Sequence, residues 1–199
     1  MPPKSVVPTS LDIWQRLKAS DSLALGELYD AYVQVLFKFG RRICTDDELI
    51  TDAIHDVFED LWLYRSTLSV VEPSNIQFYL FKALKTKLLK LLTKQNRHTE
   101  LSDADQYDHQ YVESVDFKIT ALEQETQLKN QLTQQIASLP KRQKEALLLR
   151  FYDNLSYEEI ADLMAVSRHS VYNLVFKALT QLRENLALEI LTILLIKYF

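Results

Sequence analysis

Glycine and proline are nearly absent from this chain, and their scarcity limits the available folds more than any other feature. The 199 residues contain only two glycines and five prolines. Sheet-rich folds need many tight turns, which these two residues supply, so the sequence predicts an all-α protein. The chain is long enough for one or two domains, and its 47% apolar content can fill their cores.

The remaining bulk properties exclude several classes of protein. A single cysteine, Cys44, permits neither an intrachain disulfide nor a thiolate metal cluster, which is typical of a reducing compartment. The N-terminus lacks the apolar stretch of a signal peptide, and the most apolar run, residues 186–196, is short and interrupted by Glu189. We therefore expect a cytoplasmic protein without membrane insertion. The formal net charge is −4, so any contact with nucleic acid needs a local basic patch.

A strongly two-sided helix is predicted directly after Thr45, which heads a capping box with Glu48. Apolar residues recur along one face, and the other face carries Asp52, His55, Asp56 and Glu59. This spacing could hold a metal ion on one helix. Metal sites in helical bundles draw matching ligands from other helices, however, and no second such cluster occurs in the sequence. We expect no metal and no cofactor, and interpret the stripe as a solvated or partner-binding acidic face.

A second long helix, from Ile76 to about Thr93, is basic, because no acidic residue lies between Glu72 and Glu100. One face is apolar and includes Tyr79, and the other carries Lys82, Lys85, Lys87, Lys90, Lys94 and Arg97. Three aromatic residues lie at the head of the helix: Phe78, Tyr79 and Phe81. Aromatic side chains beside lysines suit phosphates and unstacked bases. A solvated lysine face and a helix lying on a membrane surface are the alternatives.

The composition changes again at Gln95. Residues 99–127 contain eight acidic residues and one lysine, and the apolar periodicity disappears over residues 99–115. An acidic segment without periodicity predicts a linker between two domains.

The sequence of residues 156–182 predicts a helix-turn-helix. Ser156 and Glu159 form a capping box, a turn falls at Ala165, and Ser167 caps the next helix. In such motifs the second helix enters the major groove of DNA. The candidate DNA ligands on this helix are Ser167, Arg168, His169, Ser170, Tyr172, Asn173 and Lys177.

Together these motifs resemble a bacterial RNA polymerase sigma factor of the sigma-70 family, of the extracytoplasmic-function (group 4) type. The resemblance covers roughly residues 20–186. Its most specific part looks like region 4 of that family and has the sequence LPKRQKEALLLRFYDNLSYEEIADLMAVSRHSVYNLVFKALTQLRENL. It implies two small helical domains joined by a flexible acidic linker. The implied parts are a region 2-like domain (21–95), the linker (96–116) and a region 4-like domain (117–186). Outside the resemblance we expect an N-terminal arm and short helix (1–20) and an apolar helical extension (187–199).

The resemblance also implies partners and residue roles. Residues 52–62 look like the acidic helix that docks on the β′ clamp of core RNA polymerase, through Asp52, His55, Asp56, Phe58, Glu59 and Trp62. The basic helix resembles the segment that opens and reads the promoter −10 element, through Phe78, Tyr79, Lys82, Lys85, Thr86, Lys87 and Lys90. The helix-turn-helix would read the −35 element, and the β flap of the polymerase is a further implied contact.

Three functions remain open. The first is a sigma subunit that directs promoter recognition and initiation. The second is a stand-alone helix-turn-helix regulator, which predicts dimers and palindromic sites. The third is a sigma-like adaptor whose DNA targeting comes from another protein, because Thr86, Lys90, Tyr172 and Phe176 depart from the residues usual in the family.

None of the three functions is enzymatic, because the sequence holds neither a Gly-rich phosphate loop nor a set of nucleophile, base and orienting residue. By resemblance, the acidic linker would thread toward the RNA-exit path of the polymerase. The alternative is a solvated spacer. The apolar extension either packs on this chain or docks a partner such as an anti-sigma factor.

Overall fold

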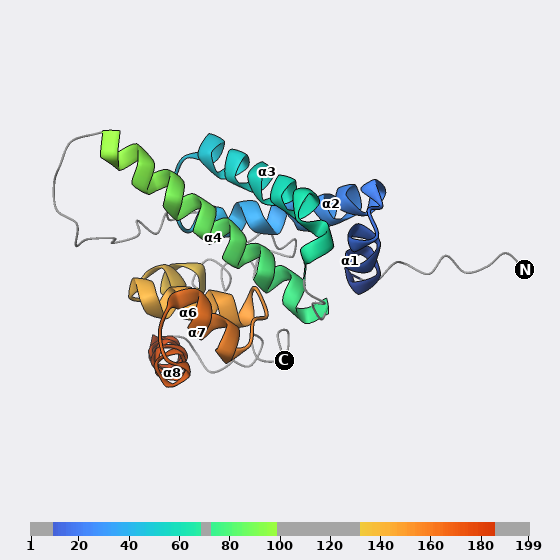
Figure 1. Ribbon diagram of the computed structural model, residues 1–199. Coiled ribbons are helices and arrows are strands. Elements are labelled where there is room, and N and C mark those ends of the chain that lie inside the picture. The colour runs from blue at the N-terminus through green and yellow to red at the C-terminus, as the bar shows by residue number, and fades with distance from the viewer. Residues whose placement is uncertain (1–9, 69–72, 99–131, 186–199) are drawn as a thin grey trace, which may run out of the picture. The chain divides into compact units, whose positions relative to one another are not determined.

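The computed structural model describes residues 10–68, 73–98 and 132–185, and every regular element within them is helical (Figure 1). The predicted all-α fold is confirmed. The chain divides into two compact units, Met1–Ser114 and Val115–Phe199. Most of the predicted acidic linker, the apolar extension at 187–199 and residues 1–9 of the arm lie outside the described residues.

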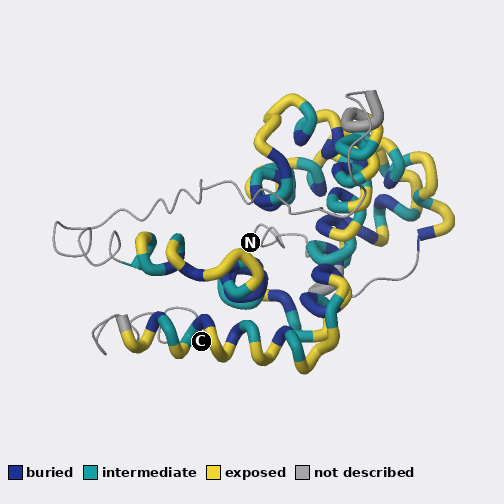
Figure 2. Tube along the Cα trace, turned by 90° about the vertical axis from the view of Figure 1, so that its left-hand side faces the viewer, coloured by how far each residue is buried: buried dark blue, intermediate teal, exposed yellow. Residues whose placement is uncertain are grey.

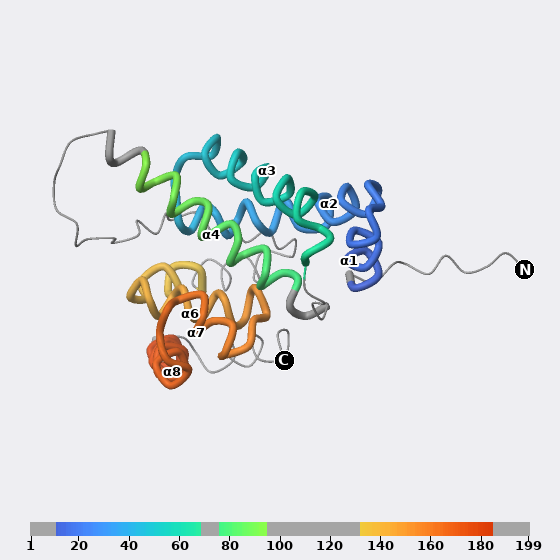
Figure 3. Tube along the Cα trace, in the orientation of Figure 1, coloured from blue at the N-terminus to red at the C-terminus, as the bar shows by residue number. Residues whose placement is uncertain are grey.

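The described part of the first unit is a bundle of four α-helices with a short 3₁₀ turn. Its elements are α1 (Ser10–Lys18), α2 (Ser22–Gly40), α3 (Asp47–Leu63), η1 (Arg65–Thr67) and α4 (Pro73–His98). Along them buried and exposed residues alternate with the helical period (Figure 2). Helices α2, α3 and α4 pack against one another, as their traces show (Figure 3), and α1 packs on α2 and α4.

Helix α1, which the sequence placed in the N-terminal arm, contributes to the core of the first unit. Trp14 is 1% exposed, and its ring meets Tyr79 of α4 edge-on with the ring centroids 5.5 Å apart. Arg16 donates to the carboxylates of Asp21 and Glu27 at 2.8–3.0 Å, which ties α1 to the start of α2. The hydrogen bond from Arg16 lowers the pKa of the Asp21 carboxyl. The bundle therefore includes α1.

The approach of α2 to α3 requires a glycine. A Cβ atom at Gly40, the last residue of α2, would lie 2.6 Å from Cγ2 of Ile50, whose side chain is fully buried. At Gly26 of the same helix a Cβ atom would meet nothing within 4 Å. The two glycines therefore differ in what an added Cβ atom would contact.

We expect opposite effects from replacing each glycine by alanine. Gly40→Ala displaces Ile50 and should lower the free energy of unfolding by about 1–3 kcal/mol. Gly26→Ala should raise it by about 0.5–1 kcal/mol, because alanine is the better helix former. Urea unfolding followed by circular dichroism measures both changes. A Gly40→Ala protein as stable as the parent would contradict this packing.

The described part of the second unit is a smaller helical bundle with its own core. Residues 132–137 are helical, and α6 (Lys141–Phe151), α7 (Tyr157–Met164) and α8 (Arg168–Asn185) follow. Helix α6 packs on α7 and α8, and α7 packs on α8. One core cluster of this unit consists of Ile136, Leu139, Leu147, Ala178 and Leu182. In neither unit does a helix within the described residues combine the length and apolar character needed to cross a membrane.

Candidate functional site

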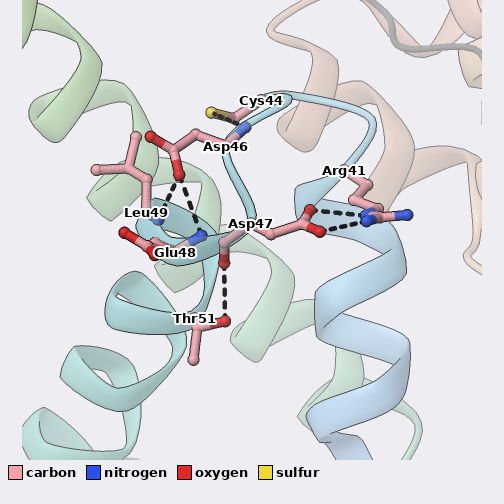
Figure 4. Close-up of polar contacts among 7 residues, drawn as sticks. All are labelled: Arg41, Cys44, Asp46, Asp47, Glu48, Leu49 and Thr51. Atoms are coloured by element: carbon pink, nitrogen blue, oxygen red, sulfur yellow. Dashed lines mark hydrogen bonds and ion pairs between the residues drawn. The ribbon is translucent and has the colours of Figure 1, made fainter.

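The acidic helix α3 is fixed at its N-terminus by two aspartates (Figure 4). The Asp46 carboxylate accepts hydrogen bonds from two backbone N–H groups of the first turn at 3.0 and 3.1 Å, so Asp46 is the N-cap. The predicted cap at Thr45 is therefore wrong by one residue. Threonine and aspartate both suit the N-cap position, so the sequence pattern did not distinguish them. Arg41, just after α2, pairs with both carboxylate oxygens of Asp47, and its hydrogen bond lowers the pKa of that carboxyl.

The acidic face of α3 divides into two edges with different surroundings. Asp52 and Glu59 are exposed, and neither has a partner among the residues that the structure describes. Asp56 and Asp60 lie toward α4, where Nζ of Lys87 is 3.6 and 2.9 Å from their carboxylates. The hydrogen bond to Asp60 is the main reason why the pKa of Lys87 is raised. The edge with Asp52 and Glu59 is thus the one available to a partner.

Three further residues that the resemblance assigned to polymerase contact differ in their burial and in their neighbours. His55 is exposed, and its Nε2 lies 3.2 Å from the hydroxyl of Tyr29. Phe58 is only 5% exposed and packs edge-on against Tyr29, so its assignment to a surface contact is corrected. By its spacing it belongs to the apolar stripe of the helix, which packing turns inward. Trp62 is half-buried beneath the guanidinium of Arg65, which lies 4.2 Å from the ring centroid.

Metal binding finds no support in the geometry of this stripe. Among the His, Cys, Asp and Glu side chains of the described residues, no group of three or more is arranged to hold a metal ion.

The basic helix α4 separates its leucines from its lysines. Its fully buried leucines are Leu80, Leu84 and Leu88. Lys82, Thr86 and Lys90 are exposed at intervals of four residues and form a stripe along the helix. Lys85 is half-buried, as are Phe78 and Tyr79, and Nζ of Lys82 lies 5.9 Å from the centroid of the Phe78 ring. Burial raises the pKa of Tyr79.

Helices α7 and α8 and the turn between them form the predicted helix-turn-helix. The Ser156 hydroxyl accepts from the N–H of Glu159 at 3.2 Å, and the Glu159 carboxylate accepts from the N–H of Ser156 at 2.8 Å, which confirms the capping box. Ala165 ends α7 in the left-handed region, with φ at 53°. The Ser167 hydroxyl accepts from the N–H of Ser170 at 3.1 Å and caps α8.

The turn at Ala165 is strained, because a Cβ atom disfavours the left-handed region by roughly 1–2 kcal/mol and glycine has none. We expect Ala165→Gly to raise the free energy of unfolding of the second unit by about 0.5–1 kcal/mol, after the extra freedom of glycine in the unfolded chain is subtracted. Thermal unfolding of the variant measures the change. A lower midpoint than that of the parent would argue against the left-handed turn.

The predicted DNA ligands of the helix-turn-helix share the exposed face of α8. The exposed members are Ser167, Arg168, His169, Tyr172, Asn173 and Lys177. Nε of Arg168 pairs with the carboxylate of Glu158 on α7 at 2.9 Å. Tyr172 and Phe176 are 55% and 59% exposed, and their ring planes lie 10° apart. Phe176 was missing from the predicted ligands, although its spacing of four residues from Tyr172 places it on the same face.

Comparison with known proteins finds similarity to sigma factors over most of the chain. The family described as Sigma-70, region 4 matches residues 129–182. Over 161 residues the chain is 21% identical to the ECF RNA polymerase sigma factor SigM of Bacillus subtilis (strain 168), a match that covers 81% of this chain and 94% of that protein. Over 139 residues it is 25% identical to the RNA polymerase sigma factor SigV of the same organism, which covers 69% of this chain and 78% of that protein.

Two solved structures share the fold. CnrH in complex with the cytosolic domain of CnrY matches with a TM-score of 0.54 and 15% identity, over 87% of this chain and 94% of that one. The sigma factor RpoE in complex with the anti-sigma factor NepR, from Bartonella quintana, matches with a TM-score of 0.51 and 17% identity, over 80% of this chain and 94% of that one. The likeness therefore extends over most of the helical elements described above.

Proposed function

Because the chain belongs to the extracytoplasmic-function type of the sigma-70 family, we propose that it binds core RNA polymerase and directs it to promoters. The polymerase supplies the chemistry, and this chain supplies the choice of sequence and the opening of the strands. One observation carries the proposal: α3 and α4 pack together while exposing an acidic and a basic surface. A single small bundle can therefore contact both a basic protein partner and DNA.

Docking on the polymerase takes place through the exposed edge of α3. Asp52 and Glu59 provide negative charge that no partner within the described residues neutralises, with His55 beside them and Trp62 at the far end of the helix. Such a face attracts the basic surface of the β′ clamp at long range and so raises the rate of association. The β flap contacts the second unit.

The −10 element binds along α4. The exposed stripe of Lys82, Thr86 and Lys90 follows the phosphates, and Phe78 offers a ring to an unstacked base. Lys87 contributes less than its neighbours, because Asp56 and Asp60 already hold its ammonium group.

Two lysine variants separate the DNA contact from the ion pair. Lys90→Gln should weaken binding to −10 single-stranded DNA and lower the slope of log K against log salt by about 0.7, because one phosphate contact is lost. Lys87→Gln should lower the free energy of unfolding by about 0.5–1 kcal/mol and change the slope less. Fluorescence anisotropy in a salt series and urea unfolding measure the two effects. Equal slopes for the two variants would contradict the distinction.

The −35 element binds to the exposed face of α8 in the major groove. Asn173 and Lys177 lie there without an internal partner among the described residues. Arg168 must break its ion pair with Glu158 before it can contact DNA. Regulation by a protein partner is also proposed, since the two structures named above are complexes with a second protein and RpoE is bound to an anti-sigma factor.

The competing functions predict different assemblies. Purified chain and purified core polymerase should co-elute from a size-exclusion column as a one-to-one complex. A chain that elutes apart from the polymerase as a dimer and binds a palindromic site would instead be a stand-alone regulator. A chain that joins the polymerase but initiates only with a third protein would be an adaptor.

A further inference from the structure

The acidic face of α3 ends on exposed apolar side chains. Three residues follow one another at intervals of seven and four positions, which places them on one side of the helix: Asp52, Glu59 and Leu63. Leu63 is 58% exposed and the adjacent Tyr64 is 60% exposed. Only three other large hydrophobic side chains within the described residues are more than half exposed, and none of them belongs to α3. The acidic face therefore has an apolar end.

Hydrogen bonds hold this end of α3 in place. Arg65 donates from Nη1 to the backbone carbonyl of Trp62 at 2.6 Å and from Nε to the hydroxyl of Ser20 at 2.9 Å. Its guanidinium also lies over the Trp62 ring. The N–H of Tyr64 donates to the carbonyl of Asp60 at 2.9 Å and closes the helix. Because the backbone under Leu63 is already ordered, a partner that binds there meets a smaller entropic cost.

We propose that Leu63 and Tyr64 form the apolar end of the surface through which α3 docks on core polymerase, a proposal that rests on the function proposed above. The partner element carries basic residues opposite Asp52 and Glu59, and an apolar side chain about 5.4 Å further along, one helical turn away. The charge of the face selects a basic partner. The combination of charged residues with an apolar contact matches the usual division of an interface into rim and core.

The two parts of this surface act on different rate constants. Asp52 and Glu59 attract the partner before contact, so neutralising them lowers the association rate and its dependence on salt. Leu63 acts only after contact, so its removal raises the dissociation rate and leaves the salt dependence unchanged. This difference distinguishes an apolar contact from a general loss of charge or of folding.

The test measures binding of the full chain to immobilised core polymerase, without DNA, at several salt concentrations. Leu63→Ala should raise the dissociation rate about five- to thirtyfold, as expected for a truncated interface core residue. Leu23→Ala is the matched control, because Leu23 is 73% exposed but lies on α2, away from the acidic face of α3. It should leave both rate constants unchanged. Unfolding midpoints of both variants should equal that of the parent, since neither side chain is buried.

The outcomes separate this inference from the function on which it rests. If Leu63→Ala behaves like Leu23→Ala while Asp52→Asn with Glu59→Gln weakens binding, the apolar end is overturned and the docking role stands. If the carboxylate variant also binds normally, both are overturned. If Leu63→Ala converts a dimer of the chain alone into a monomer in sedimentation, the occupant is a second copy and the proposal is overturned.

Discussion

Reversing the charge of Asp52 and Glu59 to lysine is expected to raise the Kd for core RNA polymerase by about 30-fold or more, which corresponds to about 2 kcal/mol. Both carboxylates are exposed, and neither has a partner within the described residues, so the fold does not depend on them. The double variant replaces attraction to a basic surface by repulsion. Most of the loss should appear in the association rate and should shrink as salt is added.

The matched control changes the net charge by the same amount elsewhere. Asp30 on α2 and Glu184 on α8 are also exposed, and Asp30→Lys with Glu184→Lys should leave the Kd within about twofold of the parent, as for charges remote from an interface. Surface plasmon resonance in a salt series measures both proteins. Equal losses in the two double variants would show that overall charge, and not the face of α3, governs binding.

The second large effect is expected at the recognition helix. Asn173→Ala should cost about 1–3 kcal/mol of binding to the −35 element and relax the base preference at one position, because asparagine can bond a base edge through two groups. Lys177→Gln should weaken binding to all sequences alike and lower the salt slope by about one, as for a phosphate contact. Both residues are exposed on the same face of α8.

A library of randomised −35 sequences, selected once with each protein, distinguishes the two roles. The sequences selected with Asn173→Ala should show a weaker base preference at one base pair. Those selected with Lys177→Gln should resemble the sequences selected with the parent. Thr180→Ala on the same face serves as the control, since the Thr180 hydroxyl already donates to the carbonyl of Phe176 at 2.9 Å. If Asn173→Ala and Lys177→Gln give the same selected sequences, Asn173 does not read a base.

The features that sequence alone predicted are those that depend on local spacing. Scarce glycine, periodic leucines and the Ser156–Glu159 pair are local patterns, and the structure confirms the all-α fold and that capping box. At the start of α3 the capping-box pattern predicted the N-cap one residue too early. Threonine and aspartate are both favoured at the N-cap position. In the structure it is the carboxylate of Asp46 that accepts hydrogen bonds from the first-turn amides.

The features that sequence missed depend on contacts between helices. Lys87 belongs to the basic face of α4 by its spacing, but the packing of α4 on α3 places it between Asp56 and Asp60. Phe58 belongs to the apolar stripe of α3 by its spacing, and only the resemblance assigned it to a polymerase contact; in the structure its ring packs edge-on against Tyr29 of α2. Helical periodicity places a residue on a face and cannot show which neighbour occupies that face.

The most direct test of the account is transcription in vitro with purified core polymerase, this chain alone and DNA of the source genome. The 5′ ends of the transcripts are then mapped. We expect initiation at discrete sites that share one motif near −10 and another near −35, and we expect this initiation to be lost with the Asp52→Lys, Glu59→Lys protein. Initiation no more specific than with core polymerase alone, or dependent on a third protein, would contradict the account.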